Sequence, residues 1–377
     1  MSSLIECTGW NMWSLVWQPF ILSLGGSTSV IGGLNSLWGA IQSILQLVTG
    51  GLADSLGRKK LVNAYYVISI VGIGITLAAR SWVYLIPSVV LFAVADALGE
   101  PAFTPLFAES VEETRRGTAF SLLSLTWFLP GFYSQLLAGF LGDRVGVRQV
   151  LYITLALEVL SLLVFAVFVK ETLRERKPVE LSGIIRSIPG NLRPRGDLIS
   201  FYAMSILDRF GWGLSGGIFV AMIYESFDFT LLQIGILTTA TSVTSALALM
   251  PVGRLVDRHG SRGSLLASAT LSAMLFFGYM STGSFVVFIA LQVVKGLAIA
   301  FWDPAHNAYL SNVVEESERG RFFGSLNGLK GILCFPASLI GAYLYESFGF
   351  SGIFTASLVF SLLTLGCALR IKESKKD

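Results

Sequence analysis

The chain contains little charge and very little histidine or cysteine. Of its 377 residues only 14% are charged, and it has two histidines and three cysteines. Cys7, Cys334 and Cys367 show neither pairing nor metal-ligand spacing, which argues against a disulfide framework and a zinc site. A phosphate-binding loop of the Gly-Lys-Ser/Thr kind and a nucleophile–base constellation are also missing. These absences argue against an enzyme, an ATP-driven pump and a bound cofactor.

Apolar sequence, by contrast, is abundant. Hydrophobic residues make up 53% of the chain, and its mean hydropathy is +0.69, whereas a soluble domain carries about 25% charged residues. Apolar stretches of about 20 residues recur along the chain, the length needed to cross a hydrocarbon core about 30 Å thick. We therefore predict an all-α membrane protein in a lipid bilayer. The net charge of +3 gives no indication of a nucleic-acid partner.

The apolar stretches predict twelve spanning helices in two halves of six. The first half, residues 1–169, has them over about 5–24, 29–53, 61–79, 83–108, 117–141 and 147–169. The second half, residues 198–377, has them over about 198–224, 231–255, 263–281, 285–310, 320–344 and 350–370. Residues 170–197 are basic, contain proline and are too polar to span, so we expect a cytoplasmic linker.

The placement of basic residues predicts the orientation. About 21 of the 27 Lys and Arg fall on alternate loops, on the linker and in the tail, and such loops stay in the cytoplasm. The opposite side has only Arg80, Arg144 and Arg148. We expect a multi-pass protein of the plasma membrane with cytoplasmic N- and C-termini.

Two loops repeat one another, with Asp54 and Asp257 203 positions apart. Each reads G-x-x-x-D-x-x-G followed by basic residues. Three further blocks recur in the same order: Glu6 with Gly9-Trp10 as Asp208 with Gly211-Trp212, one residue out of step, Glu100-Pro101-Ala102 as Asp303-Pro304-Ala305, and residues 111–117 as residues 314–320. A shorter echo containing Gly139, Asp143 and Gly146 follows the range 117–141. The order of these blocks indicates a duplicated chain.

The doubled loop resembles the signature of the major facilitator superfamily, G-x-x-x-D-R-x-G-R-R/K-R/K. Ser55 replaces the usual Arg in the first copy, and Ser261 stands at an Arg position in the second. The resemblance covers essentially the whole chain. It implies twelve helices in two pseudo-symmetric halves, secondary transport by alternating access, and a central site lined by the first, fourth, seventh and tenth helices. A monomer is sufficient for such a cycle.

The loop residues are predicted to form a conformational latch that stabilises the outward-facing state. An aspartate can meet the positive end of a neighbouring helix, and Arg58 can pair with Glu109, while Ser261 and Asn312 stand at the corresponding places of the second half. The alternative is an ordinary basic turn. The predicted latch comprises Gly50, Asp54, Gly57, Arg58, Lys59, Glu109, Arg116, Gly253, Asp257, Arg258, Gly260, Arg262 and Arg319.

Charged residues inside the apolar stretches are costly and mark function by default. Most fall on helices that line the cavity in the resembling fold; the range 147–169, expected outside it, has only Glu158, which we expect to face a neighbouring helix or water. With mid-helix tryptophans they make up the predicted substrate and proton cavity: Trp17, Asp96, Glu100, Trp127, Asp208, Arg209, Lys295, Trp302, Asp303, His306 and Lys330.

These residues allow several roles. Asp208 or Asp303 can pair with Lys330, and Glu100 or Asp303 can carry a proton, because a carboxylate in low dielectric can take up and release one. The alternative is that they are helix-packing salt bridges or gate contacts. His306 is more often structural than a proton relay.

A cavity with both aromatic and charged groups favours a small organic solute over an inorganic ion. We predict proton-coupled transport of such a substrate, with a lean toward efflux of amphipathic, drug-like compounds over uptake of a metabolite such as a sugar or organic acid. Two features of the drug antiporters in this family are incomplete or missing. Pro130-Gly131 is only a fragment of their Gly-Pro-rich stretch, and the Arg that they carry in the middle of the fourth helix has no counterpart in the middle of 83–108. The remaining alternative is a non-transporting sensor or scaffold, against which the intramembrane charges argue.

Overall fold

The computed structural model describes residues 1–110, 126, 129–173, 194, 196–314 and 319–371. Within these ranges the side chains of 50–56, 104, 108–109, 197, 311 and 319–321 lie outside the description. All elements in the described ranges are helices. The chain divides into two compact units, the first comprising Met1–Ile188 and Thr230–Gly235, the second Pro189–Phe229 and Ile236–Asp377.

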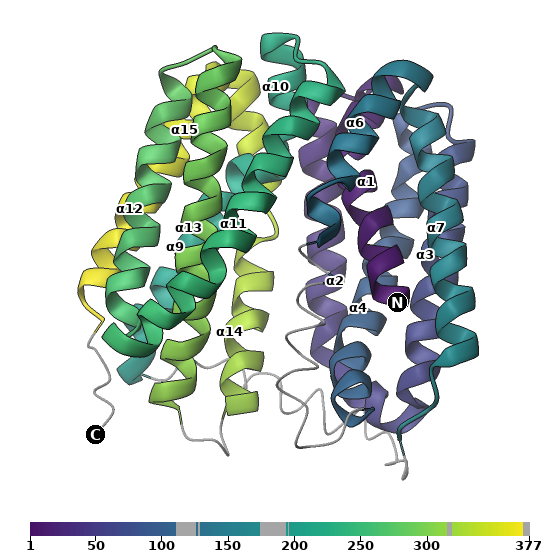
Figure 1. Ribbon diagram of the computed structural model, residues 1–377, viewed down its shortest axis with the longest axis horizontal. Helices are drawn as coiled ribbons and strands as arrows, with labels where there is room; N and C mark the ends of the chain where they lie inside the picture. The colour runs from purple at the N-terminus through teal and green to yellow at the C-terminus, as the bar shows by residue number, and fades with distance from the viewer. Residues whose placement is uncertain (111–125, 127–128, 174–193, 195, 315–318, 372–377) are drawn as a thin grey trace. The chain divides into compact units, whose positions relative to one another are not determined.

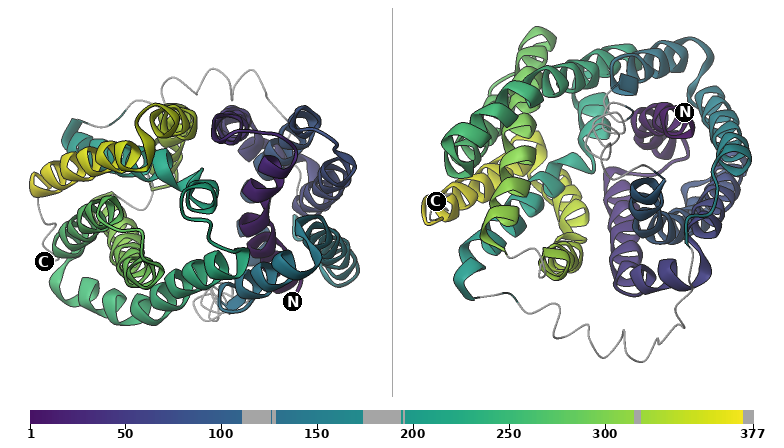
Figure 2. Two further views of the ribbon diagram at one scale, coloured as in Figure 1. Left: turned by 90° about the horizontal axis from the view of Figure 1, so that it is seen from above. Right: turned by 60° about the horizontal axis from the view of Figure 1, so that its bottom comes forward.

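The first unit is a helical bundle (Figure 1). Its helices are α1 (Ser2–Ser23), α2 (Thr28–Leu56), α3 (Arg58–Ala78), the short 3-10 helix η1 (Trp82–Tyr84), α4 (Leu85–Glu109), α6 (Ser134–Val145) and α7 (Val147–Phe168). Figure 2 shows the helices of this unit from two further directions. Helix α3 packs along α4 and α7, α1 packs along α7 and α6, and α2 packs along α4. Helices α1, α3 and α4 thereby enclose the space that becomes the candidate site.

The second unit is also a helical bundle. Its elements are η3 (Gly196–Leu198), α9 (Ile199–Gly216), α10 (Phe219–Phe227), α11 (Leu231–His259), α12 (Ser261–Met280), α13 (Phe285–Val313), α14 (Arg319–Cys334) and α15 (Ala337–Leu369). Helix α12 packs along α13 and α15, and α9 packs along α15 and α14. Helix α11 begins in residues that belong to the first unit and continues in the second.

Most predicted helices agree with the observed ones to within about three residues, and the differences have local causes. The predicted helix over 198–224 is two helices, α9 and α10, because Gly216 and Gly217 are poor helix formers. The predicted range 320–344 is interrupted before α15, where Pro336 cannot donate a backbone hydrogen bond. The predicted helix over 117–141 lies partly outside the described residues.

The turns recur with the spacing of the sequence motif. Among the described residues, six have positive φ, and they form three pairs that are each 203 positions apart. The pairs are Gly25 (79°) with Asp228 (52°), Gly57 (101°) with Gly260 (82°), and Gly146 (96°) with Gly349 (70°). At five of these positions glycine avoids the steric cost of left-handed backbone.

Asp228 is the one residue of these pairs that is not glycine, and it is exposed. We expect Asp228→Gly to raise the free energy of unfolding by about 1 kcal/mol, because an L side chain in left-handed backbone costs about that much. Gly25→Ala should lower the free energy of unfolding by a similar amount. The cause would be backbone strain alone, because a Cβ at this position would meet nothing within 4 Å and so would not clash. Thermal unfolding in detergent checks both. A lower midpoint for Asp228→Gly would show that the aspartate side chain is itself stabilising.

Eight helical stretches of the described residues are long and apolar enough to cross a membrane. Helix α1 is not among them, although it forms over the predicted range. Its polar residues Glu6, Asn11 and Gln18 lower its mean hydropathy. Polar groups at membrane depth are expensive unless they serve a site, so α1 is the first place to look for one.

Candidate functional site

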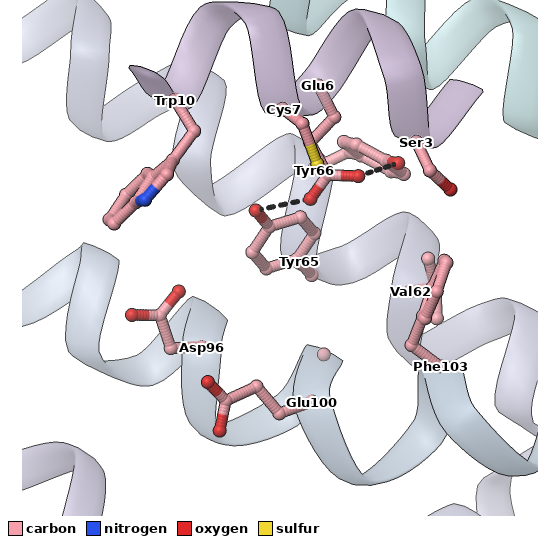
Figure 3. Close-up of a pocket in the computed structure, with 11 residues that line it drawn as sticks. Ser3, Glu6, Cys7, Trp10, Val62, Tyr65, Tyr66, Asp96, Glu100 and Phe103 are labelled. Carbon is pink, nitrogen blue, oxygen red and sulfur yellow. Dashed lines mark hydrogen bonds between the residues drawn. The ribbon is translucent and has the colours of Figure 1, made fainter. Parts of the chain in front are cut away.

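The first unit contains a cavity of about 480 Å³ between α1, α3 and α4. On α1 the lining residues are residues 3, 6, 7 and 10, and on α4 they are residues 96, 99, 100 and 103, the i, i+3, i+4, i+7 pattern that places them on one face of each helix. Figure 3 shows the α1 residues facing Asp96 and Glu100 of α4 across the cavity. The lining consists of Ser3, Glu6, Cys7, Trp10, Val62, Tyr65, Tyr66, Asp96, Gly99, Glu100 and Phe103.

Glu6 is held by two neighbouring phenols of α3. The hydroxyl of Tyr65 donates to Oε1 at 2.8 Å, and that of Tyr66 donates to Oε2 at 2.6 Å (Figure 3). Gly99 of α4 makes room for the Tyr65 ring, because a Cβ there would lie 2.9 Å from it. Charge-assisted hydrogen bonds of this kind are about twice as strong as neutral ones, so the carboxylate has a fixed position on the cavity wall.

Asp96 and Glu100, both predicted for the cavity, line it and receive hydrogen bonds from α2. The indole Nε1 of Trp38 donates to Asp96 Oδ2 at 2.8 Å, and the amide Nε2 of Gln46 donates to the Glu100 carboxylate. Helix α2 thereby orients both acids toward α1. Sequence reasoning did not identify Trp38 as a partner of Asp96.

A smaller chamber of about 30 Å³ continues from the cavity toward α7. It shares Glu6, Trp10, Tyr65 and Asp96 with the cavity and ends at Glu158. Aromatic rings form much of its wall, with the Trp38 and Phe92 centroids 5.4 Å apart and the Trp13 and Phe92 centroids 5.1 Å apart. Trp17, predicted for the cavity, lines neither space: it is buried and stacks on Trp13 at 4.9 Å.

The ionisable groups that line the cavity and the chamber are acidic. Their lining includes Glu6, Asp96, Glu100 and Glu158, and none of the described lining residues is Lys, Arg or His. Removing several carboxylates from water without cationic partners is expensive. The arrangement therefore favours a bound cation, bound protons, or both, together with aromatic surface for an organic ligand to contact.

The second unit gathers most of its predicted residues around Lys330 and His306. His306 is buried between the rings of Phe201 and Trp302, with centroids at 4.9 and 5.2 Å. Its Nε2 lies 2.9 Å from Ser205 Oγ and 3.4 Å from Lys330 Nζ.

The predicted acids of this unit lie near the same lysine. Asp208 interacts electrostatically with Lys330 and Arg209 and accepts a hydrogen bond from Trp212, and Asp303 also interacts with Lys330. Lys295 lies apart from this group, with its ammonium over the Trp212 ring at 5.8 Å and the Phe219 ring at 5.1 Å. Trp127 lies outside the described residues.

Comparison with known proteins decides the family. The profile of the Major Facilitator Superfamily matches residues 1–195 and 201–377. The chain belongs to the Major Facilitator Superfamily. It is therefore a membrane transporter and not an enzyme.

Relatives within the superfamily include multidrug resistance proteins. Multidrug resistance protein MdtG of Dickeya zeae (strain Ech586) is 26% identical over 342 residues, 88% of this chain and 81% of its own. MdtG of Enterobacter lignolyticus (strain SCF1) is 25% identical over 373 residues, 94% of this chain and 88% of its own.

Solved superfamily structures share the fold. The nucleoside transporter NupG matches with a TM-score of 0.75 and 16% identity, covering 98% of this chain and 96% of its own. The human organic anion transporter MFSD10 (TETRAN) matches with a TM-score of 0.70 and 17% identity, covering 97% of both chains. At such identities the likeness establishes the fold alone.

The superfamily loop after α2 makes contacts within its own unit. The backbone N–H groups of Arg58 and Lys59 each donate to the Glu171 carboxylate at 3.2 Å, which caps the start of α3. Glycine is needed at position 57 for two reasons: its φ is 101°, and a Cβ there would lie 2.7 Å from Glu171 Oε2. Sequence reasoning did not identify Glu171 as a partner of this loop.

The basic residues of the two loops have equivalent contacts. Lys59 Nζ donates to the backbone oxygen of Ala166 at 2.9 Å, and the Arg262 guanidinium donates to that of Leu369 at 3.0 Å. Donors and acceptors are both 203 positions apart. A cation at the carboxyl end of a helix is stabilised by the helix dipole, so each loop ties the third helix of its unit to the last.

Other latch residues are exposed or not described. Asp257 and Arg258 are exposed, and a Cβ at Gly253 would meet nothing within 4 Å. Arg116 lies outside the described residues. The surroundings of Gly50 and the side chains of Asp54, Glu109 and Arg319 also lie outside the description.

The shorter echo of the motif has an observed role in the first unit. The Asp143 carboxylate accepts hydrogen bonds from the backbone N–H groups of Leu231 at 2.9 Å and Leu232 at 2.8 Å. Gly139 permits this approach, because a Cβ there would lie 2.3 Å from the Leu231 oxygen. The aspartate thus caps the first turn of α11, the kind of helix-end contact that the sequence predicts for aspartates of this motif.

Proposed function

We propose that the chain is a secondary transporter that exports amphipathic organic cations in exchange for protons. The observation that carries the proposal is the cavity of α1, α3 and α4, with three carboxylates and four aromatic side chains but no basic residue in its described lining. A positively charged aromatic ligand satisfies both features, because carboxylates and aromatic faces attract cations. The relatives named as multidrug resistance proteins support export of such compounds.

The position of the cavity favours loading from the cytoplasm. Its lining starts at Ser3, in the first turn of α1, and reaches Phe103, in the last turns of α4. The placement of basic loops supports a plasma-membrane protein with this end, and both termini, in the cytoplasm. An exporter takes up its substrate from that side.

The finer architecture belongs to the same proposal. Twelve spanning helices in two pseudo-symmetric halves, 1–169 and 198–377 joined by the linker 170–197, are supported by the paired turns and the paired loop contacts. Such repeats are the usual basis of alternating access. A monomer is sufficient, the loop residues serve as the latch of this cycle, and the Asp208, Arg209, Asp303, His306 and Lys330 group takes part in moving protons.

Ligand-dependent thermal unfolding of the purified protein tests the substrate class. Tetraphenylphosphonium and ethidium serve as organic cations, p-toluenesulfonate as an aromatic anion, and sucrose as a neutral solute. We expect only the cations to stabilise the protein, by about 2.7 kcal/mol at a hundred times the Kd. Stabilisation by the anion or the sugar, without an effect of the cations, would turn the proposal toward uptake of a metabolite.

A further inference from the structure

Glu158 of α7 is an acid whose surroundings need explanation. Its side chain is 7% exposed, and it points into the small chamber between α1, α3, α4 and α7. None of the described side chains donates a hydrogen bond to its carboxyl group, and the neighbouring carboxylates of Glu6 and Asp96 would repel a negative charge there. Glutamate is almost never this buried without a partner, so the position points to something that the chamber binds.

The titratable groups that face this chamber from the packed helices are acids and weak acids. Those that line it are Glu6 of α1, Tyr65 of α3 and Asp96 of α4, while Cys7 and Tyr66 line the adjoining cavity. No Lys, Arg or His belongs to the described lining of the chamber. Several carboxylates this close together in low dielectric cannot all be ionised, so at least one proton must reside among them.

The hydrogen-bond donors distinguish Glu6 from Glu158. Tyr65 and Tyr66 both donate to Glu6, and donors stabilise the ionised form of a carboxyl group. Glu158 has no such donor among the described residues. The negative charge therefore belongs on Glu6 and the proton on Glu158.

The size of the chamber matches this assignment. A space of about 30 Å³ holds a single water molecule, and a buried water needs two to four polar partners. Glu6, Glu158, Ser69 and Thr154 line the chamber and supply such partners. The described residues contain no group of three His, Cys, Asp or Glu side chains that could hold a metal ion, whereas a proton needs only one of these carboxylates to bind it.

We propose that Glu158 and Glu6 form a proton-binding site of this transporter, behind the substrate cavity and in addition to the charged group of the second unit. The carboxylic acid of Glu158 gives its proton to the chamber water as that water gives one of its own to Glu6, so one O–H bond breaks and one forms at each step. Proton binding by this pair stands independently, whereas its role in coupling rests on the proposed function. In this proposal Asp96 and Glu100 contact the substrate in the cavity.

Infrared difference spectroscopy between acid and alkaline pH tests the proton site without any substrate. The parent protein should show the C=O band of a protonated carboxylic acid that titrates, and Glu158→Gln should lack that band. Asp228→Asn, which removes an exposed acid far along the chain, should keep it. The proposal is overturned if the spectra of Glu158→Gln and the parent coincide.

Transport in proteoliposomes tests the coupling role. Glu158→Gln should exchange tetraphenylphosphonium between the two sides as the parent does, but its accumulation driven by a pH gradient should fall at least tenfold. Glu6→Gln should show the same split, which guards against a packing defect at Glu158. Retained gradient-driven accumulation in both variants, or accumulation driven by a sodium gradient instead, refutes the coupling role. Absence of exchange in the parent refutes the proposed substrate class instead and leaves the infrared result to decide the proton site.

Discussion

Gly341→Ala is expected to lower the free energy of unfolding by about 3 kcal/mol or more, because overpacking a helix contact has costs of that order. Gly341 lies near the start of α15, against α9 in the second unit. A Cβ at this position would lie 1.9 Å from the backbone oxygen of Leu214 and 2.6 Å from its carbonyl carbon. The clash is with backbone, so no side-chain rotation relieves it and the two helices must separate.

Gly366→Ala is the matched control in the part of α15 beyond the kink at Gly349. A Cβ at Gly366 would meet nothing within 4 Å, and the position is exposed. Alanine should leave stability unchanged there or raise it by up to about 1 kcal/mol through helix propensity. Thermal unfolding in detergent compares the two variants. Equal midpoints would show that α9 and α15 do not approach as closely as the structure places them.

The helical membrane fold was predictable because the sequence contains long apolar stretches and an internal repeat. The repeat of the Asp54 loop at Asp257 indicates a duplication, and the structure adds turns and caps with the same spacing. Helix boundaries were predictable where glycine ends an apolar run, as at Gly57 and Gly260. The break between α9 and α10 was missed although Gly216 and Gly217 mark it, because apolar residues continue on both sides of the two glycines.

The candidate site was predictable only in part. Asp96 and Glu100 stand out as charges in an apolar stretch, four positions apart. Glu6 was recognised as a repeat partner of Asp208 but was not assigned to the cavity. Tyr65 and Tyr66 were missed because α3 was expected to lie away from it, and two tyrosines in an apolar helix do not differ from interface residues until the Glu6 carboxylate lies between them.

The predicted latch shows a different limit of sequence reasoning. A motif indicates which residues matter but not which partner each one binds. The predicted pairing of Arg58 with Glu109 stays a prediction, because the Glu109 side chain lies outside the described residues. The described contacts of the loop are made by the backbone of Arg58 and by Lys59, with Glu171 and Ala166. Both partners lie more than 100 positions away along the chain, and neither belongs to the repeated motif. Only tertiary packing of α3 along α7 brings them together.

Asp96→Asn is expected to weaken binding of tetraphenylphosphonium at least tenfold while leaving the protein folded. The substitution removes one negative charge from the cavity, and a charge pair about 4 Å apart is worth about 4 kcal/mol at an effective dielectric constant of 20. Desolvation of the cation offsets part of this, but a loss of about 1.4 kcal/mol already corresponds to tenfold. The asparagine oxygen can still accept the Trp38 hydrogen bond that Asp96 accepts at 2.8 Å, so the local structure is kept.

Trp38→Phe separates the charge of Asp96 from its hydrogen bond. Phenylalanine keeps an aromatic ring to pack on Phe92, now 5.4 Å from the indole, and it removes the N–H donor but not the carboxylate. Because the charge that attracts the cation remains, we expect affinity within about threefold of the parent, less than the roughly 1.4 kcal/mol that makes a tenfold change. Equilibrium binding of radiolabelled tetraphenylphosphonium measures both variants, with Asp228→Asn as the control for loss of an acid outside the cavity. If Asp96→Asn binds like the parent while Trp38→Phe does not, the cavity selects its ligand by aromatic contact and the electrostatic argument for cation export fails.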